Sequence, residues 1–209
     1  MPTALISVYH KEGIVTFAQR LVDLGWDLLA SGGTARALSD AGLTVRDVAE
    51  LVGGGSILGH RVVTLSREVA ASLLAKNIPE DRAELERLGI PWIDLVCVDL
   101  YPLREEILRK GATEESVLEL TDIGGPTLLS EAAKGRRIVI STPEDRQLVL
   151  DWLKAGRPYE RDFLRLLGTR ANWTVAQYSL WSACAHSRGI ADHQLTHEDL
   201  ECVLVQLDS

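Results

Sequence analysis

The segment TDIGGPTLLSEAAK, residues 121–134, carries an acid, a glycine turn and a lysine in an order that suits chemistry on a small anion. The carboxylate of Asp122 can accept a hydrogen bond from a substrate amide. The backbone N–H groups of the turn around Gly124 are donors of the kind that form an oxyanion hole. A helix opening at Pro126 would place Lys134 about two turns further on, where its flexible stem is expected to reach back to the reacting centre. The same residues also fit a plain helix whose basic last residue interacts with the helix dipole.

A second group of residues is typical of a phosphate site. The segment SGGT, residues 31–34, follows an apolar run and opens a helical pattern, and helix N-termini bind anions. Lys11 follows the first apolar run, in the segment YHK, where His10 is expected at the surface. Because the carboxyl ends of parallel strands meet at one edge of a sheet, we expect Lys11 to lie beside residues 31–34. A threonine-capped turn and a solvated lysine remain the alternative without function.

Two further segments hold weaker candidates. Arg61, in HRVVT, can bind phosphate through two hydrogen bonds, although a single loop arginine is more often solvated. Asp99 and Tyr101, in DLYP, follow the strongest apolar run in the sequence. Asp99 either binds a ligand or caps a helix that begins near Pro102, and Tyr101 either lines a pocket or packs in the core.

The elements that must position these residues follow from the periodicity of the sequence. Strands are expected over residues 4–8, 26–30, 43–48, 93–100 and 137–141. Helices are expected over residues 14–25, 31–42, 67–75, 79–88 and 142–156, and residues 160–186 predict one long helix or two. In the helix over 142–156, Thr142 is the expected N-cap. This alternation is typical of an α/β fold with a mostly parallel sheet, helices on both faces and a C-terminal helical region.

Composition limits the function classes. The net charge of −8 argues against nucleic acid and anionic membranes as partners, while still allowing a small phosphate ligand. The three cysteines, Cys97, Cys184 and Cys202, lie in no metal-ligand or disulfide pattern, so no metal is expected, and Cys97 reads as a core residue. The N-terminal apolar run is too short for a signal peptide, and no run of 18 apolar residues occurs, which favours a cytoplasmic protein.

An ordered series of motifs links the chain to a known family. The segments SGGTARAL, AGLTVRDV, KNIPED, DLYP, TDIGGPTLL and EAAK resemble, in that order, the IMP cyclohydrolase domain of the bifunctional enzyme of purine synthesis. The resemblance implies the three-layer fold of methylglyoxal synthase over residues 1–189, with residues 190–209 as a polar tail. The transformylase domain of the bifunctional enzyme is not recognised, so formyl transfer is not expected.

The resemblance also implies a set of site residues. Lys134 matches the family's proton donor and acceptor, Tyr101 matches a tyrosine near the reacting amide, and Asp122 is expected to orient or deprotonate that amide. The nucleotide contacts of the family fall on Tyr9, His10, Lys11, Ser31, Gly32, Gly33, Thr34, Arg61, Val62, Val63, Thr64, Val98, Asp99, Asp122, Ile123 and, in the same turn, Gly124.

Several positions depart from the family pattern, among them the usual S-x-S-D-K, which reads Ser7-Val8-Tyr9-His10-Lys11 here. An active-site lysine of the family is replaced by Val63, a histidine by Ser66, and the asparagine before L-Y-P by Asp99. The residues expected to bind phosphate are largely kept, whereas those around the base have changed. The change suggests an altered heterocycle or altered chemistry.

The implied reaction is an internal condensation. A carboxamide nitrogen attacks a neighbouring formamide carbon and water leaves, so no cofactor is expected and effective molarity supplies much of the rate. Three functions remain open: FAICAR to IMP conversion in purine synthesis, closure of a purine-analogue nucleotide such as a pyrazole ribotide in nucleoside antibiotic synthesis, or inactive purine-nucleotide binding. Methylglyoxal synthase activity is a weaker fourth. The long C-terminal helical region, with Trp173 and Trp181, suggests a homodimer.

Overall fold

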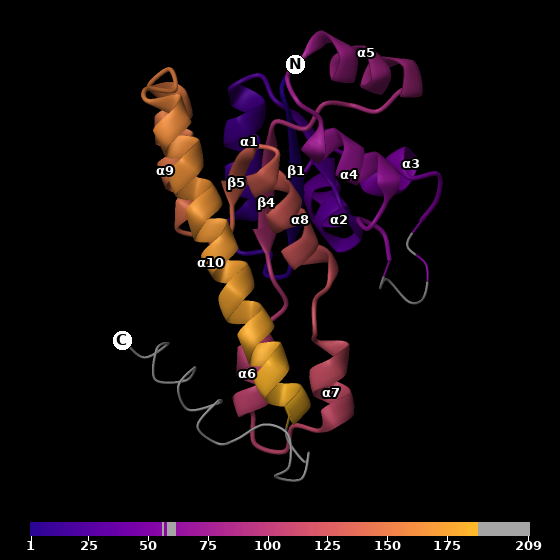
Figure 1. Ribbon diagram of the computed structural model, residues 1–209, viewed down its shortest axis with the longest axis vertical. Helices are drawn as coiled ribbons and strands as arrows, with labels where there is room; N and C mark the ends of the chain where they lie inside the picture. The colour runs from indigo at the N-terminus through magenta and orange to yellow at the C-terminus, as the bar shows by residue number, and fades with distance from the viewer. Residues whose placement is uncertain (56, 58–61, 188–209) are drawn as a thin grey trace. The chain divides into compact units, whose positions relative to one another are not determined.

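The computed structural model describes residues 1–55, 57 and 62–187, and its elements alternate between strands and helices (Figure 1). The strands are β1 Thr3–Val8, β2 Asp27–Ala30, β3 Arg46–Asp47, β4 Leu95–Asp99 and β5 Ile138–Ile140. The helices are α1 Ile14–Asp23, α2 Gly32–Asp40, α3 Val48–Leu51, α4 Arg67–Leu74, α5 Pro79–Leu88, α6 Leu103–Leu108, α7 Glu114–Glu119, α8 Gly124–Lys134, α9 Asp145–Lys154 and α10 Glu160–Ser187.

The chain divides into two compact units. The first comprises Met1–Leu100 and Ile123–Asn172, and the second comprises Tyr101–Asp122 and Trp173–Ser209. The expected division into a domain over residues 1–189 and a tail over 190–209 falls partly outside the described residues and stays a prediction. Among the described residues, no helix is long and apolar enough to cross a membrane.

The first unit is built on a five-stranded parallel sheet in the order β3-β2-β1-β4-β5, which confirms the predicted α/β class. The register pairs Ala4 of β1 with Leu28 and Leu95, so the strands end together at one edge of the sheet. The chain leaves β1 toward β2 on one side, and β4 occupies the other side. The carboxyl ends of β1 and β4 therefore flank a topological switch point, where open parallel sheets bind ligands.

Helices cover both faces of this sheet because strand side chains alternate between the two faces. On one face, Ile6, Cys97 and Ile140 share a core with buried residues of α1, α2, α9 and α10. On the other face, α8 packs against β4, β5 and α4. Cys97 is fully buried, as expected for a core residue, and burial raises the pKa of its thiol to about 11.

The second unit has fewer internal contacts than the first. It contains α6, α7 and residues 173–187 of α10. Thr113 and Ser116 form a capping box that begins α7. The hydroxyl of Tyr178 donates to the carbonyl of Leu120 over 3.0 Å and accepts the backbone N–H of Asp122 over 2.7 Å. One α10 side chain therefore holds the loop that precedes α8.

Three local predictions were wrong. The third strand covers only Arg46–Asp47, because the chain turns into α3 at the buried Val48. Thr142 is not an N-cap: its carbonyl accepts the N–H of Asp145 in a turn, and α9 begins at Asp145 after Glu144. Helix α8 begins at Gly124 instead of Pro126, because a proline is tolerated anywhere in the first turn, where N–H groups lack helical partners.

Candidate anion site at the strand ends

The glycine turn after β2 has the geometry of an anion site. Ser31 is the N-cap of α2, with an extended backbone and no side-chain capping bond. Gly32 has a φ of 36°, in a region that side chains with a Cβ rarely adopt. The amides of Gly32 and Gly33 belong to the first helical turn, whose N–H groups have no partner within the helix. Together with the positive end of the helix dipole, these amides favour a negative ligand.

Serine and threonine side chains tie this turn to the end of β1. The Oγ atoms of Ser7 and Ser31 are 2.9 Å apart. The buried Thr34 places its Oγ1 3.2 Å from both the nitrogen and the carbonyl oxygen of Val8. Because the hydroxyl of Thr34 hydrogen-bonds to the backbone of Val8, Thr34 stabilises the glycine turn. Ser7 was not among the predicted site residues, although its position on β1, opposite Val98, would have indicated it.

Lys11 lies over the glycine turn, as the sequence predicts. Its Cε atom is 4.0 Å from the position that a Cβ atom would take at Gly33. Its ammonium donates to the carbonyl of Val8 and, over 3.0 Å, to that of Tyr9. Burial lowers the pKa of Lys11 below its ordinary value, and the charge of Asp99 opposes this shift. Lys11 is itself exposed, and its cation therefore lies beside the amides that open α2.

Asp99, at the carboxyl end of β4, fixes the loop that carries Lys11. Its Oδ2 accepts the backbone N–H of His10 over 2.8 Å and lies 3.0 Å from Nδ1 of the same histidine. The backbone N–H of Tyr9 donates to the Asp99 carbonyl, and the rings of Tyr9 and His10 meet edge to face. Asp99 is therefore a bridge between β1 and β4 and not the cap of α6, which begins after Pro102. Val98 is buried, so only its backbone faces a ligand.

The predicted residues of the next segment are only partly described. Arg61 lies outside the described residues. Val62 forms an isolated bridge with Ile57, Thr64 is buried, and Val63 is half-buried between them. Ser66, where the family has histidine, accepts the N–H of Val69 and caps α4. A histidine side chain is a poorer N-cap than serine, so this departure has a structural role of its own.

The remaining predicted residues, Tyr101, Asp122, Ile123 and Gly124, are divided between the two units. Asp122 and Tyr101 belong to the second unit, where Tyr101 is 38% exposed and the amide of Asp122 is held by Tyr178. Ile123 is exposed and precedes Gly124, the first residue of α8 in the first unit. No sequence pattern indicated Tyr178, because its hydrogen-bond partners lie more than 50 residues away along the chain.

Lys134 is not brought to the glycine turn. It is the last residue of α8, it is exposed, and the chain then enters β5 beside the start of β4, where Ile138 donates to Asp94 over 2.9 Å. The turn after β2 lies instead at the carboxyl ends of the strands. Five strand residues span about 16 Å, so Lys134 lies near the opposite edge of the sheet. Its predicted role as proton donor is not tested by this arrangement alone and stays a prediction.

No group of three or more potential metal ligands occurs within the part of the chain that the structure describes. The groups gathered at the strand ends are backbone amides, hydroxyls, Lys11, His10 and Asp99. Amides at a helix N-terminus and a lysine are groups that suit an anion.

Comparisons with known proteins agree with this geometry. Residues 13–127 match the family described as MGS-like domain. The bifunctional purine biosynthesis protein PurH of Aquifex aeolicus (strain VF5) is 43% identical over 156 residues, which make up 73% of this chain and 31% of that protein. This chain thus spans about a third of the length of that curated relative. The crystal structure of ForH has a TM-score of 0.79 and 34% identity, and the match covers 90% of this chain and 97% of the ForH chain.

Proposed function

Because the chain belongs to the MGS-like domain family, we propose that it catalyses a cyclohydrolase-type ring closure on a formylated amino-heterocycle carboxamide ribotide. The observation that carries the proposal is the seat formed by Lys11 and the amides of Gly32 and Gly33 at the switch point of the sheet. The similarity to PurH, named as a purine biosynthesis protein, supports a purine-type ribotide as the ligand class.

The seat would hold the 5′-phosphate of the ribotide. Backbone amides at a helix N-terminus bind phosphate without a second cation, and Lys11 adds a charge-assisted hydrogen bond. In the free protein the ammonium of Lys11 has backbone carbonyls as its hydrogen-bond partners and Asp99 as a nearby charge. A phosphate would therefore add a strong acceptor to a cation that is already positioned by its neighbours.

The proposed chemistry needs few groups beyond this seat. The carboxamide nitrogen forms a bond to the formamide carbon, and the former formyl oxygen leaves with two protons as water. Holding both groups on one fixed ligand supplies effective molarity. Asp122 would orient the amide or remove its proton, while Tyr101 and the amides around Gly124 would stabilise the oxyanion. The bonds from Tyr178 to the Asp122 amide and the Leu120 carbonyl fix the backbone that carries Asp122.

Lys134 is the member of the proposed set whose position fits least well. Within the first unit, α8 carries it to the edge of the sheet opposite the phosphate seat. The variant Lys134→Ala separates two explanations. A proton donor predicts loss of turnover with unchanged nucleotide affinity. A cation that stabilises the end of α8 predicts turnover like that of the parent protein and a slightly lower melting temperature.

A ring other than that of ordinary purine synthesis is favoured by two observations. The resemblance assigns the changed residues Val63, Ser66 and Asp99 to the base side of the expected contacts, whereas Lys11 and residues 31–34 of the expected phosphate seat are kept. The ForH chain matches this chain over nearly its whole length. We therefore propose a purine-analogue ribotide, such as a pyrazole ribotide, as the preferred substrate over the imidazole compound.

Ultraviolet spectroscopy tests the proposal directly. The purified protein is mixed with formylated aminoimidazole carboxamide ribotide or with its pyrazole analogue, and ring closure is followed by absorbance. Faster closure of the pyrazole compound supports a purine-analogue ribotide as the substrate. Faster closure of the imidazole compound supports a role in ordinary purine synthesis. Binding of both compounds without turnover of either would reduce the function to nucleotide binding and contradict the proposed catalysis.

A further inference from the structure

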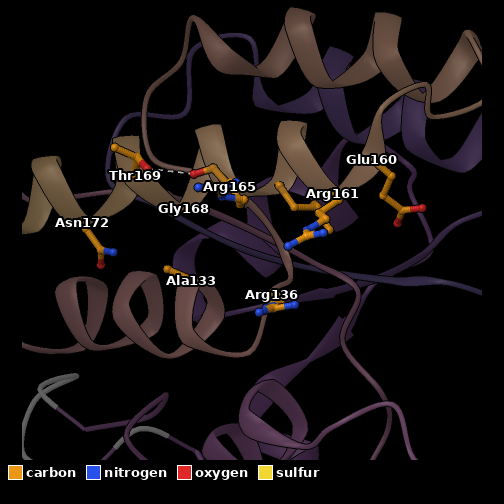
Figure 2. Close-up of a pocket in the computed structure, with 9 residues that line it drawn as sticks. Ala133, Arg136, Glu160, Arg161, Arg165, Gly168, Thr169 and Asn172 are labelled. Atoms are coloured by element: carbon orange, nitrogen blue, oxygen red, sulfur yellow. Dashed lines mark hydrogen bonds between the residues drawn. The ribbon is translucent and has the colours of Figure 1, made fainter.

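A cavity of about 680 Å³ lies between the end of α8 and the first half of α10, inside the first unit (Figure 2). Its lining is rich in arginine: Arg136 follows α8, and Arg161 and Arg165 come from α10. Glu160 is the single acid of the lining and pairs with Arg157. A lining with three arginines and one glutamate is unusual in a chain whose net charge is −8.

The arginines are poorly matched by carboxylates. Arg165 makes only a long contact of 3.8 Å with Asp162, and both side chains are about three-quarters exposed. Within the described residues, Arg136 and Arg161 have no carboxylate within 4.0 Å. Structural arginines of this chain are arranged differently, as Arg137 shows by donating to two backbone carbonyls and stacking on Trp92.

The backbone also departs from local preference at two places in this cavity. Arg136 has a φ of 57°, a conformation that a bulky side chain adopts rarely and at a cost. Gly168 stands inside helix α10, where glycine is unfavourable by about 1 kcal/mol relative to alanine. A Cβ atom at Gly168 would meet the Cβ of Ala133 at an ordinary 3.7 Å, so packing does not require glycine there. Gly168 therefore lines the cavity without placing a side chain in it.

We propose that this arginine-lined cavity binds a phosphorylated small molecule at a second site, separate from the phosphate seat at the strand ends. Arginine side chains bind phosphate oxygens through paired N–H donors, and Asn172 supplies a neutral polar group beside them. Figure 2 shows the Arg161 side chain extending from α10 toward the side of the cavity where Arg136 lies. The volume falls in the range of small-molecule sites.

The second site lies away from the first. Arg136 precedes β5 by two residues, at the edge of the sheet where the strands begin, whereas Lys11 and Gly33 lie at the edge where they end. About five residues of strand separate the two edges, or about 16 Å. The second site therefore does not depend on the proposed ring closure, and the two proposals can fail separately.

Calorimetric titration with inorganic pyrophosphate tests the proposal in a Lys11→Ala background, which weakens the first seat. One remaining binding event is expected. The double variant Arg161→Gln, Arg165→Gln should weaken it tenfold or more, since charge-assisted hydrogen bonds are the strong ones. The charge-matched control Arg67→Gln, Arg87→Gln alters two exposed arginines outside the cavity and should leave it unchanged.

Two further arms complete the test. Gly168→Leu should block binding without changing charge, and circular dichroism checks that the variant is folded. Citrate should bind at least tenfold more weakly than pyrophosphate. Equal affinity for citrate would overturn the assignment to phosphate. The site itself would be overturned if pyrophosphate did not bind in the Lys11→Ala background. It would also be overturned if the Arg161/Arg165 variant and the Arg67/Arg87 control lowered the affinity by the same factor.

Discussion

The ammonium of Lys11 donates to two main-chain carbonyls beside a glycine turn. Removing this side chain should therefore lower the affinity for phosphate and change the rest of the structure little. Lys11→Ala is expected to weaken ribotide binding about 10- to 100-fold, the range of one hydrogen bond to a charged group. Lys154→Ala, at the exposed end of α9, is the matched control. Isothermal titration measures both, and equal affinities for the two variants would remove Lys11 from the site.

The same residue predicts a pH dependence. Burial lowers the pKa of Lys11 below its ordinary 10.5, against the opposing charge of Asp99. Phosphate affinity should therefore fall as the pH rises through this lowered pKa, earlier than for a solvated lysine. In this window the folded state holds fewer protons on Lys11 than the unfolded state does, so the contribution of Lys11 to stability rises with pH there. Circular dichroism at each pH separates a loss of affinity from unfolding, and Lys11→Arg should move the fall in affinity to higher pH.

Gly135 is required by close packing and not by its backbone conformation. A Cβ atom there would lie 1.8 Å from the carbonyl oxygen of Leu73 in α4. Gly135→Ala should therefore push α8 and α4 apart and lower the free energy of unfolding by about 3 kcal/mol. Gly168→Ala, where the new Cβ meets only ordinary contact, should raise it by roughly 0.5–1 kcal/mol. Urea unfolding measures the free energy of unfolding of both variants. A similar decrease in both would contradict the prediction.

At the scale of elements, Tyr178 links α10 to the loop before α8 inside the second unit. Tyr178→Phe removes the hydroxyl that accepts the N–H of Asp122, and hydrogen exchange of this amide should accelerate. If Asp122 acts on the substrate, turnover should fall while ribotide affinity is kept. Tyr159→Phe, with an 87% exposed side chain, is the control. Exchange at Asp122 that matches the parent protein would show that the hydroxyl does not hold this loop.

The same scale shows what sequence patterns could and could not predict. All five strands were predicted from short apolar runs, although the third is shorter than expected. Lys11 lies beside the glycine turn, as predicted, because parallel strands end at one edge of the sheet. Helix α7 was missed because none of its residues is buried, so it has no apolar periodicity and depends on its capping box. The role of Lys134 stays a prediction, because spacing along a helix does not by itself fix where a side chain reaches. A helix of 11 residues is about 16 Å long, so its first and last residues lie at different places in the fold.

The whole molecule is acidic, with a net charge of −8, so surfaces where copies associate need apolar side chains to offset repulsion. Trp173 is 59% exposed on α10, and aromatic residues are enriched at protein interfaces. We expect a homodimer of twice 22.9 kDa by sedimentation. Trp173→Glu should shift it toward the monomer, because a buried unpaired charge is costly. Leu88→Glu adds the same charge at an exposed position of α5 and should leave the dimer intact. A monomer in the parent protein, or equal dissociation by both variants, would exclude Trp173 from such an interface.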